Sequence, residues 1–216
     1  MKIAIIGPLC SGKSTLANDL MLACENVSVI EEAHRRYHDE GIVVPIAENT
    51  TMASSLLLFN RSCKQVLTTN DAEQVTIILG SPFEEFMYTY HASKIVPNSQ
   101  LDHEYLQSLI ELTLQSMQEY DLILKIDHFQ DIPYYRDAVR PDKDVKYRDK
   151  VNDTINELLS EHSPYQIIDA AIKSRIRSVS GTREERMRQC KQYIGQLANN
   201  KLRCLEGAAR LPNCSR

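Results

Sequence analysis

The sequence begins with a short apolar run that leads directly into a glycine-containing loop, KIAIIGPLCSGKST. The run KIAII is continuous and rich in β-branched residues, which is typical of a strand buried on both faces. Leu16, Leu20 and Ala23 recur along one side of the next segment, so we predict a helix from Ser14 to about Cys24. A strand, a tight loop and a helix in this order form the start of a βαβ unit.

The loop itself, Gly7 to Ser14, fits the pattern G-x-x-x-x-G-K-[ST] in full. Glycine permits backbone angles that a β-carbon forbids, so the loop N–H groups can turn inward and bind phosphate oxygens at the start of the helix. Lys13 would reach the β and γ phosphates of ATP, and the Ser14 hydroxyl would ligate Mg²⁺. The predicted nucleotide-binding residues are Gly7, Pro8, Leu9, Cys10, Ser11, Gly12, Lys13, Ser14 and Thr15.

Strand-like and helix-like segments alternate along the rest of the chain, which predicts an α/β protein with a parallel sheet. The further strands are predicted at NVSVIEE, QVTIILG, YDLILKID and YQIID. Helices are predicted at 33–41, 51–68, 82–94, 101–120 and 151–162, and from Ile172 to about Asn200 with a break at Ser180-Gly181. We expect one domain over residues 1–200 and a tail over 201–216.

The loop resembles the Walker A motif of P-loop NTPases, and its context resembles the nucleoside and nucleotide kinases. EEAHRRYHDEG after the second strand and YDLILKIDHFQDIPYYRDAVRP around the fourth are similar in layout to nicotinamide riboside kinase-type and deoxynucleoside kinase-like enzymes. The resemblance covers about residues 1–175. It implies a three-layer P-loop NTPase fold, in which a five-stranded parallel sheet in the order 2-3-1-4-5 has helices on both faces. A small lid is expected at about residues 129–150.

Two carboxylates, Glu31 and Glu32, end the second predicted strand, where they should face the glycine loop. Deoxynucleoside kinases, which this layout resembles, place a glutamate there to accept the proton of the substrate hydroxyl. Either Glu31 or Glu32 is therefore a candidate base, and the alternative for one of them is a solvated acid at a helix start. Arg35, Arg36 and Tyr37 are candidates for substrate binding, whereas His34 and His38 are expected at solvated helix positions.

The third predicted strand departs from the P-loop pattern, because VTIILGSP has Gly80 and Ser81 where an aspartate is usual. Three explanations stay open. Mg²⁺ is held by Ser14, phosphates and waters with help from Glu31 or Glu32; Glu84 or Glu85 replaces the missing acid; or phosphoryl transfer is weak.

Arginines between the fourth strand and the next helix suit a lid that closes over ATP. Arg140 occupies the D-x-x-R position after Asp137 that the resemblance implies, and we assign it a catalytic role; Arg136 and Arg148 are candidate ATP-binding residues. A solvated, salt-bridged loop is the alternative. The resemblance implies that Arg175 and Arg177 would frame an adenine, as that region does in related kinases, with an ion-paired helix as the alternative.

The amino-acid composition limits the binding partners that we expect for this protein. A net charge of −4 and a pI near 5.9 disfavour non-specific duplex binding, which needs excess lysine and arginine. None of the six cysteines forms a C-x-x-C pair, so we expect free thiols rather than a zinc site. With no apparent leader or membrane span, the sequence predicts a soluble, cytoplasmic protein that does not bind membranes.

The function predicted from these features is an ATP-dependent kinase acting on a nucleoside, nucleotide or related small molecule. One alternative is a kinase for a base or strand end within a polynucleotide, which predicts a basic, aromatic groove built from 34–37 and 88–94. A nucleotide-operated regulator is a second alternative, although the N-K-x-D motif of GTPases is absent. The sequence is compatible with either a monomer or a homodimer.

Overall fold

Five strands form an all-parallel sheet in a computed structural model of the chain. The structure describes residues 1–69, 74–96, 100–127, 132 and 145–209, without the side chains of Glu48 and of 200–209. The sheet order is β2-β3-β1-β4-β5, which confirms the order expected from the resemblance. The strands are β1 (Lys2–Ile6), β2 (Val27–Ile30), β3 (Val75–Leu79), β4 (Leu122–Ile126) and β5 (Ile176–Val179).

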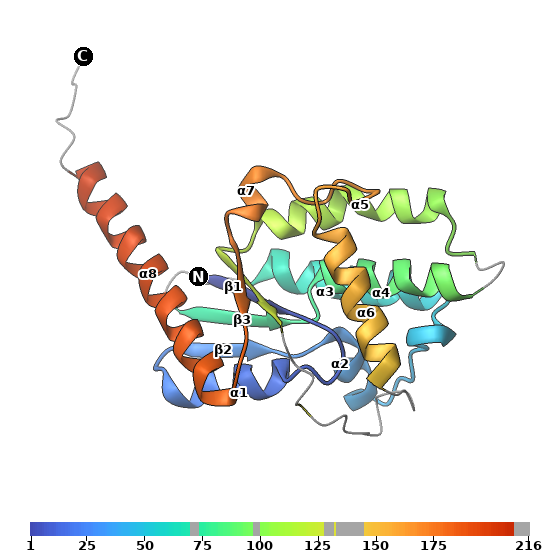
Figure 1. The fold of residues 1–216 in the computed structure, drawn as a ribbon, viewed down its shortest axis with the longest axis horizontal. Helices are drawn as coiled ribbons and strands as arrows, with labels where there is room; N and C mark the ends of the chain where they lie inside the picture. The colour runs from blue at the N-terminus through green and yellow to red at the C-terminus, as the bar shows by residue number, and fades with distance from the viewer. Residues whose placement is uncertain (70–73, 97–99, 128–131, 133–144, 210–216) are drawn as a thin grey trace, which may run out of the picture.

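Helices cover both faces of this sheet, as Figure 1 shows. One layer holds α1 (Lys13–Ala23) and α8 (Arg183–Ala209). The other holds α3 (Met52–Thr68), α4 (Pro82–Ile95), α5 (His103–Gln118) and α6 (Val145–Leu158). The shorter helices are α2 (Ala33–Asp39), the 3-10 turn η1 (Ala47–Asn49) and α7 (Ala170–Lys173). The three-layer α/β architecture is therefore confirmed.

The alternation of side chains along the central strands produces two separate cores. In β1, Ala4 and Ile6 pack toward α3, α4 and α5, whereas Ile3 and Ile5 pack toward α1 and α8. Successive residues of a strand point to opposite faces, so a strand between two helical layers must be apolar throughout. All five residues of β1 are buried, as the continuous apolar run predicted.

The chain reverses its direction of travel across the sheet at β1. From β1 it crosses to β2 and returns through β3, and after β4 it continues to β5 on the other side. Loops that follow the strands on either side of such a switch point leave a crevice between them, where α/β proteins bind ligands. The glycine loop follows β1 and therefore lies at this crevice.

The C-terminal third differs from the sequence prediction. YQIID is not a strand, because Gln166 has a φ of +48°, which lies outside the range of extended chains. Asp169 instead caps α7, accepting a 2.7 Å hydrogen bond from the Ile172 N–H. The fifth strand is Ile176–Val179, within the segment predicted to be helical, and its break at Ser180-Gly181 is the β5–α8 loop. The α8 helix continues to Ala209, into the predicted tail, and α6 begins at Val145 rather than Val151.

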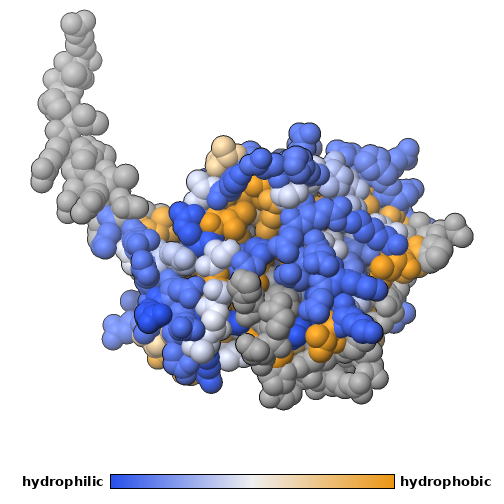
Figure 2. Space-filling view, viewed as in Figure 1, coloured by the Kyte–Doolittle hydropathy of each residue, from blue (hydrophilic) through white to orange (hydrophobic). Residues whose placement is uncertain are grey.

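The visible surface is mostly polar. In Figure 2 the apolar residues of this face form separate small patches between hydrophilic ones. In the part of the chain that the structure describes, no helix has both the length and the apolar character that a bilayer crossing requires.

Candidate functional site

The glycine loop joins β1 to α1 through two residues in left-handed conformation. Gly12 has a φ of +90°, and a β-carbon placed there would lie 3.2 Å from Ile132 Cδ1, so both the backbone and the packing favour glycine. Cys10 has a φ of +56°, an uncommon value for a non-glycine residue. The first turn of α1 contains no acidic side chain, and its N-cap Gly12 supplies no side-chain acceptor, so this helix start is suited to an anion.

Lys13 is buried with its ammonium group among oxygen atoms. Its Nζ donates to the carbonyls of Gly7 at 2.7 Å and Pro8 at 3.2 Å. It also lies 3.5 Å from Glu32 Oε1 and 3.3 Å from Glu84 Oε1. Both carboxylates are buried, so this cation compensates negative charge in a region from which water is largely excluded.

Glu84 connects the end of β3 to the glycine loop. It belongs to a capping box in which the Ser81 side chain accepts from the Glu84 N–H at the start of α4. The carboxylate of Glu84 accepts from the N–H groups of Gly80 at 3.1 Å, Ser81 at 3.2 Å and Gly7 at 3.3 Å. Of the two candidates for the missing strand-three acid, Glu84 rather than Glu85 contacts Lys13.

Glu32 reaches the same centre from the end of β2, the edge strand beside β3, whereas Glu31 does not. The Cα of Glu32 would lie only 3.0 Å from a β-carbon at Gly80, whose φ is +66°. Glycine at position 80 therefore lets the chain after β2 pack closely against the end of β3. Arg35 Nε donates to Glu32 Oε2 at 3.2 Å, so Arg35 holds the carboxylate in place. Glu31 is partly exposed, and burial and the charge of Glu32 raise its pKa.

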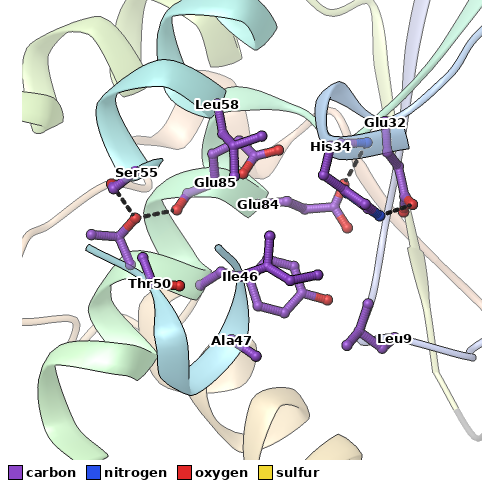
Figure 3. Close-up of a pocket in the computed structure, with 13 residues that line it drawn as sticks. Leu9, Glu32, His34, Ile46, Ala47, Thr50, Ser55, Leu58, Glu84 and Glu85 are labelled. Atoms are coloured by element: carbon purple, nitrogen blue, oxygen red, sulfur yellow. Dashed lines mark hydrogen bonds and ion pairs between the residues drawn. The ribbon is translucent and has the colours of Figure 1, made fainter. Parts of the chain in front are cut away.

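A narrow cavity of about 40 Å³ opens beside these carboxylates, and we call it the inner cavity. Figure 3 shows Leu9 and Glu32 at one end of it and Ser55 and Thr50 at the other. Its walls come from the glycine loop, α2, η1, α3 and α4. It is lined by Leu9, Glu32, His34, Ile46, Ala47, Thr50, Ser55, Leu58, Gly80, Glu84, Glu85, Tyr88 and Thr89.

His34 is a lining residue that the sequence analysis placed wrongly. Its side chain is 11% exposed and its Nε2 lies 3.5 Å from Glu32 Oε2, whereas the His38 side chain is 44% exposed, as expected. Helical periodicity separates the two faces of α2, but the sequence alone does not show which face the sheet covers.

Burial raises the pKa values of two carboxyl groups that line the cavity. Burial raises the pKa of Glu84, and the charge of Lys13 opposes the shift. The pKa of Glu85 is raised well above its ordinary value by burial and by the charges of Glu84 and Glu32. The protonated forms are favoured because a charged carboxylate loses its hydration on burial.

A second space, which we call the outer cleft, lies on the other side of the loop and has a volume of about 510 Å³. It lies between the start of α1 and the β5–α8 loop, with Gly12, Thr15, Ile132 and Thr182 among its lining residues. Arg186 of α8 links its two sides: Nη1 donates to the Ser11 carbonyl at 3.0 Å and Nε to the Gly181 carbonyl at 2.9 Å.

The sequence analysis did not single out Arg186. The segment TREERMRQCKQ contains several arginines, and only the path of α8 shows which one is buried against the loop. The sequence signal for Arg186 was the glycine turn directly before α8. A helix that begins after this turn starts at the carboxyl edge of the sheet, where the glycine loop also lies.

The comparisons place this geometry in a known family. A family profile described as an AAA domain matches residues 2–175, which spans β1 to the residue before β5. The chain belongs to this AAA domain family. No curated protein matches the sequence.

Solved structures that resemble this AAA domain protein share its fold. NadR protein in complex with NR superposes with a TM-score of 0.62 at 14% identity, covering 91% of this chain and 51% of that chain. The chain thus spans about half the length of that NadR chain. Deoxyadenosine kinase from M. mycoides with bound dATP gives a TM-score of 0.59 at 15% identity, covering 90% of this chain and 100% of that chain. The likeness shows a P-loop nucleoside kinase-like fold.

Other predicted site residues of the AAA domain protein lie elsewhere. Arg36 and Tyr37 line a groove between α2 and α3, where the Arg61 guanidinium stacks 4.2 Å from the centre of the Tyr37 ring. Arg148 is buried and donates from Nη1 to the Ile132 carbonyl at 2.8 Å. Arg136 and Arg140, and most of the predicted lid, lie outside the described residues.

One further expectation does not fit the geometry. Arg175 and Arg177 lie at the amino end of β5 with the start of β4, away from the glycine loop, so they do not frame a base bound there. The groove expected from 34–37 and 88–94 stays a prediction. His34 and Tyr88 line the inner cavity, whereas Lys94 pairs with Glu157.

Proposed function

We propose that this protein transfers the γ-phosphoryl group of ATP to a hydroxyl of a small nucleoside-like acceptor held in the inner cavity. The observation that carries the proposal is the shared wall between loop and cavity. Leu9 belongs to the glycine loop and lines the cavity, and Glu32 and Glu84 line the cavity and contact Lys13. An acceptor in this cavity would therefore lie next to the phosphates that Lys13 binds.

Glu32 is the better candidate for the base. Its carboxylate lines the cavity and is 3.5 Å from the ammonium group that would engage the γ-phosphate. When Lys13 turns toward phosphate oxygens, Glu32 loses part of its cationic partner and becomes a stronger proton acceptor. Proton removal by a positioned carboxylate contributes about 10²–10⁴-fold to rate in general base catalysis. Glu84, whose oxygens already accept three N–H groups, serves to fix the loop.

Mg²⁺ fits the oxygen atoms of this site. No group of three or more His, Cys, Asp or Glu side chains could hold a metal within the part of the chain that the structure describes. Mg²⁺ in kinases commonly uses few protein ligands together with substrate phosphates. Ser14 would ligate the metal, and phosphate oxygens and waters would complete its coordination. When bound, Mg²⁺ neutralises charge on the transferring phosphoryl group.

The outer cleft would receive the nucleoside part of ATP. It begins at Gly12 and Thr15, at the positive end of α1, and extends to Thr182 and Arg186. The candidate lid residues Arg136, Arg140 and Arg148 would close the site and exclude water. Closure matters because an open site would hydrolyse ATP.

Incubation with γ-labelled ATP and Mg²⁺ tests the proposal, using nucleosides, nucleotides, nicotinamide riboside and oligonucleotides as acceptors. We expect label in a small-molecule product with wild-type protein and none with Lys13→Ala. Lys64→Ala, an exposed lysine on α3, is the matched control and should retain full transfer. Release of phosphate without a labelled acceptor would favour the regulatory ATPase, and label in an oligonucleotide would favour the polynucleotide kinase.

A further inference from the structure

Apolar walls and a small set of polar atoms define what the inner cavity can hold. Leu9, Ile46, Ala47 and Leu58 supply flat apolar surface. At the end shown opposite Glu32, Ser55 and Thr89 share a 2.6 Å hydrogen bond, and the Thr89 hydroxyl also donates to the Glu85 carbonyl at 2.7 Å. These hydroxyl groups are already paired within the protein. The cavity is therefore shaped for a ring with polar atoms at particular positions on its edge.

Glu85 differs from the two other acids of the cavity. Glu32 and Glu84 are held by Lys13 and by further donors. Glu85 is 8% exposed, and its carboxyl group makes no hydrogen bond or ion pair to the residues that the structure describes. A buried carboxyl without donors is costly, and the cost falls when a ligand supplies N–H groups.

Tyr88 supplies a second polar atom one helical turn along α4. Residues three apart on a helix lie on the same side, so Glu85 and Tyr88 face the cavity together. The Tyr88 hydroxyl oxygen is buried and has no hydrogen-bond partner in the described part of the chain. A buried tyrosine hydroxyl normally finds a partner, so its position indicates that a ligand provides one.

The charge of the lining residues disfavours an anionic acceptor. Three carboxyl groups line the cavity, and the cations that pair with Glu32 and Glu84, Lys13 and Arg35, are already engaged and are not lining residues. A phosphate monoester would approach these acids in a poorly hydrated space, where like charges repel strongly. Enzymes that accept a phosphorylated substrate need arginine or lysine beside it, and the described cavity wall has neither.

We propose that the inner cavity selects an unphosphorylated acceptor whose nitrogenous ring donates N–H hydrogen bonds to Glu85 and offers a polar partner to the Tyr88 hydroxyl. This inference rests on the proposed function for the position of the reacting hydroxyl. A ring that carries an amino group beside a basic ring nitrogen matches the site best, because a proton can be shared with the carboxyl and the pair becomes charge-assisted.

Calorimetric binding with matched nucleosides tests the inference independently of turnover. Cytidine is compared with uridine and adenosine with inosine, each in the presence of Mg²⁺ and a non-hydrolysable ATP analogue. We expect the amino nucleoside of at least one pair to bind about ten-fold more tightly than its keto partner. Its 5′-monophosphate should bind at least about ten-fold more weakly than the nucleoside itself.

Substitutions assign the preference to named atoms. Glu85→Gln should reduce the amino preference to less than about three-fold, and Tyr88→Phe should weaken the preferred nucleoside by about three- to ten-fold. The controls are Glu104→Gln on the exposed side of α5 and Tyr193→Phe, whose hydroxyl donates to the Ser178 carbonyl of β5, and each should leave both values unchanged. Unchanged binding of the ATP analogue shows that each variant is folded.

The outcomes separate this inference from the proposed function. It is overturned if no nucleoside binds, if the monophosphates bind best, or if Glu85→Gln keeps the amino preference. Glu85-dependent binding without any phosphorylated product would uphold the inference and refute phosphoryl transfer. Phosphoryl transfer to a nucleoside, with a nucleoside preference that Glu85→Gln leaves unchanged, would support the proposed function and overturn the inference.

Discussion

The inner cavity and the outer cleft lie on opposite sides of one loop, yet they are built in different ways. The cleft is bordered by the start of α1 and by backbone that Arg186 fixes through two carbonyl groups. The cavity is lined by side chains from the loop, α2, η1, α3 and α4, and three of them are acids. Backbone groups suit a ligand common to many proteins, whereas scattered side chains suit one particular molecule. Variants that affect one space, both or neither therefore test this division.

Lys13→Ala should have the largest effect, because Lys13 serves both spaces. The variant removes the ammonium group for the phosphates and leaves Glu32 and Glu84 without their shared cation. We expect turnover to fall by at least about 10²–10³-fold and affinity for ATP to fall as well. Steady-state kinetics and ATP calorimetry measure the two effects. Full transfer by a folded Lys13→Ala protein would show that the loop is not the phosphate site.

Glu32→Gln should affect the acceptor side alone. Loss of the proton acceptor should lower kcat by about 10²–10⁴-fold while ATP binding stays within about three-fold. Glu31→Gln is the matched control at the adjacent position, and it should keep most of the turnover because Glu31 is not part of the Lys13 centre. If the Glu31 variant loses turnover and the Glu32 variant keeps it, the assignment of the base is reversed.

Local patterns predicted the loop well, whereas long-range packing decided most of the remaining site. Gly7, Gly12, Lys13 and Ser14 lie within eight consecutive residues, so the sequence shows the motif directly, whereas the binding roles assigned to them stay predictions. Glu84 was one of two candidates, and its backbone partners at Gly7 and Gly80 were needed to choose it. Which arginine of α8 meets the loop depends on where a distant helix packs, and no local pattern contains that information.

The error at the fifth strand has a similar cause. Arg175 and Arg177 flank Ile176 and resemble the charged surface of a helix, whereas YQIID has the apolar character of a strand. In the structure, β5 lies at the sheet edge beside β4, where Arg177 and Ser178 are exposed and charge is tolerated. In this four-residue strand Val179 is buried and Ile176 is partly buried, and such a short pattern is easily misread as helix.

Arg186→Lys should affect the donor side with a smaller magnitude. Lysine keeps the charge but cannot donate to Ser11 and Gly181 through a rigid planar group. We expect the KM for ATP to rise about ten-fold and the acceptor KM to stay within about two-fold. Arg188→Ala removes an exposed arginine of α8 that does not line the cleft and should change neither value. Equal changes in both KM values for Arg186→Lys would mean that the two spaces are not separable.

The smallest expected effect distinguishes two adjacent glutamates within the cavity wall. Because burial raises the folded-state pKa of Glu85, the folded protein keeps that proton to higher pH than the unfolded chain. Wild-type stability therefore falls as pH rises from the ordinary glutamate pKa through the raised one. Glu85→Gln removes this cost of ionising a buried carboxyl group. The substitution should raise the melting temperature by about 2–6 °C at pH 7.5, with a smaller gain at pH 5. Glu84→Gln should instead lower it, because glutamine cannot accept three N–H groups and a lysine. Melting curves that shift in the same direction for both variants would contradict the different roles assigned to them: one acid holds the loop, and the other waits for a ligand.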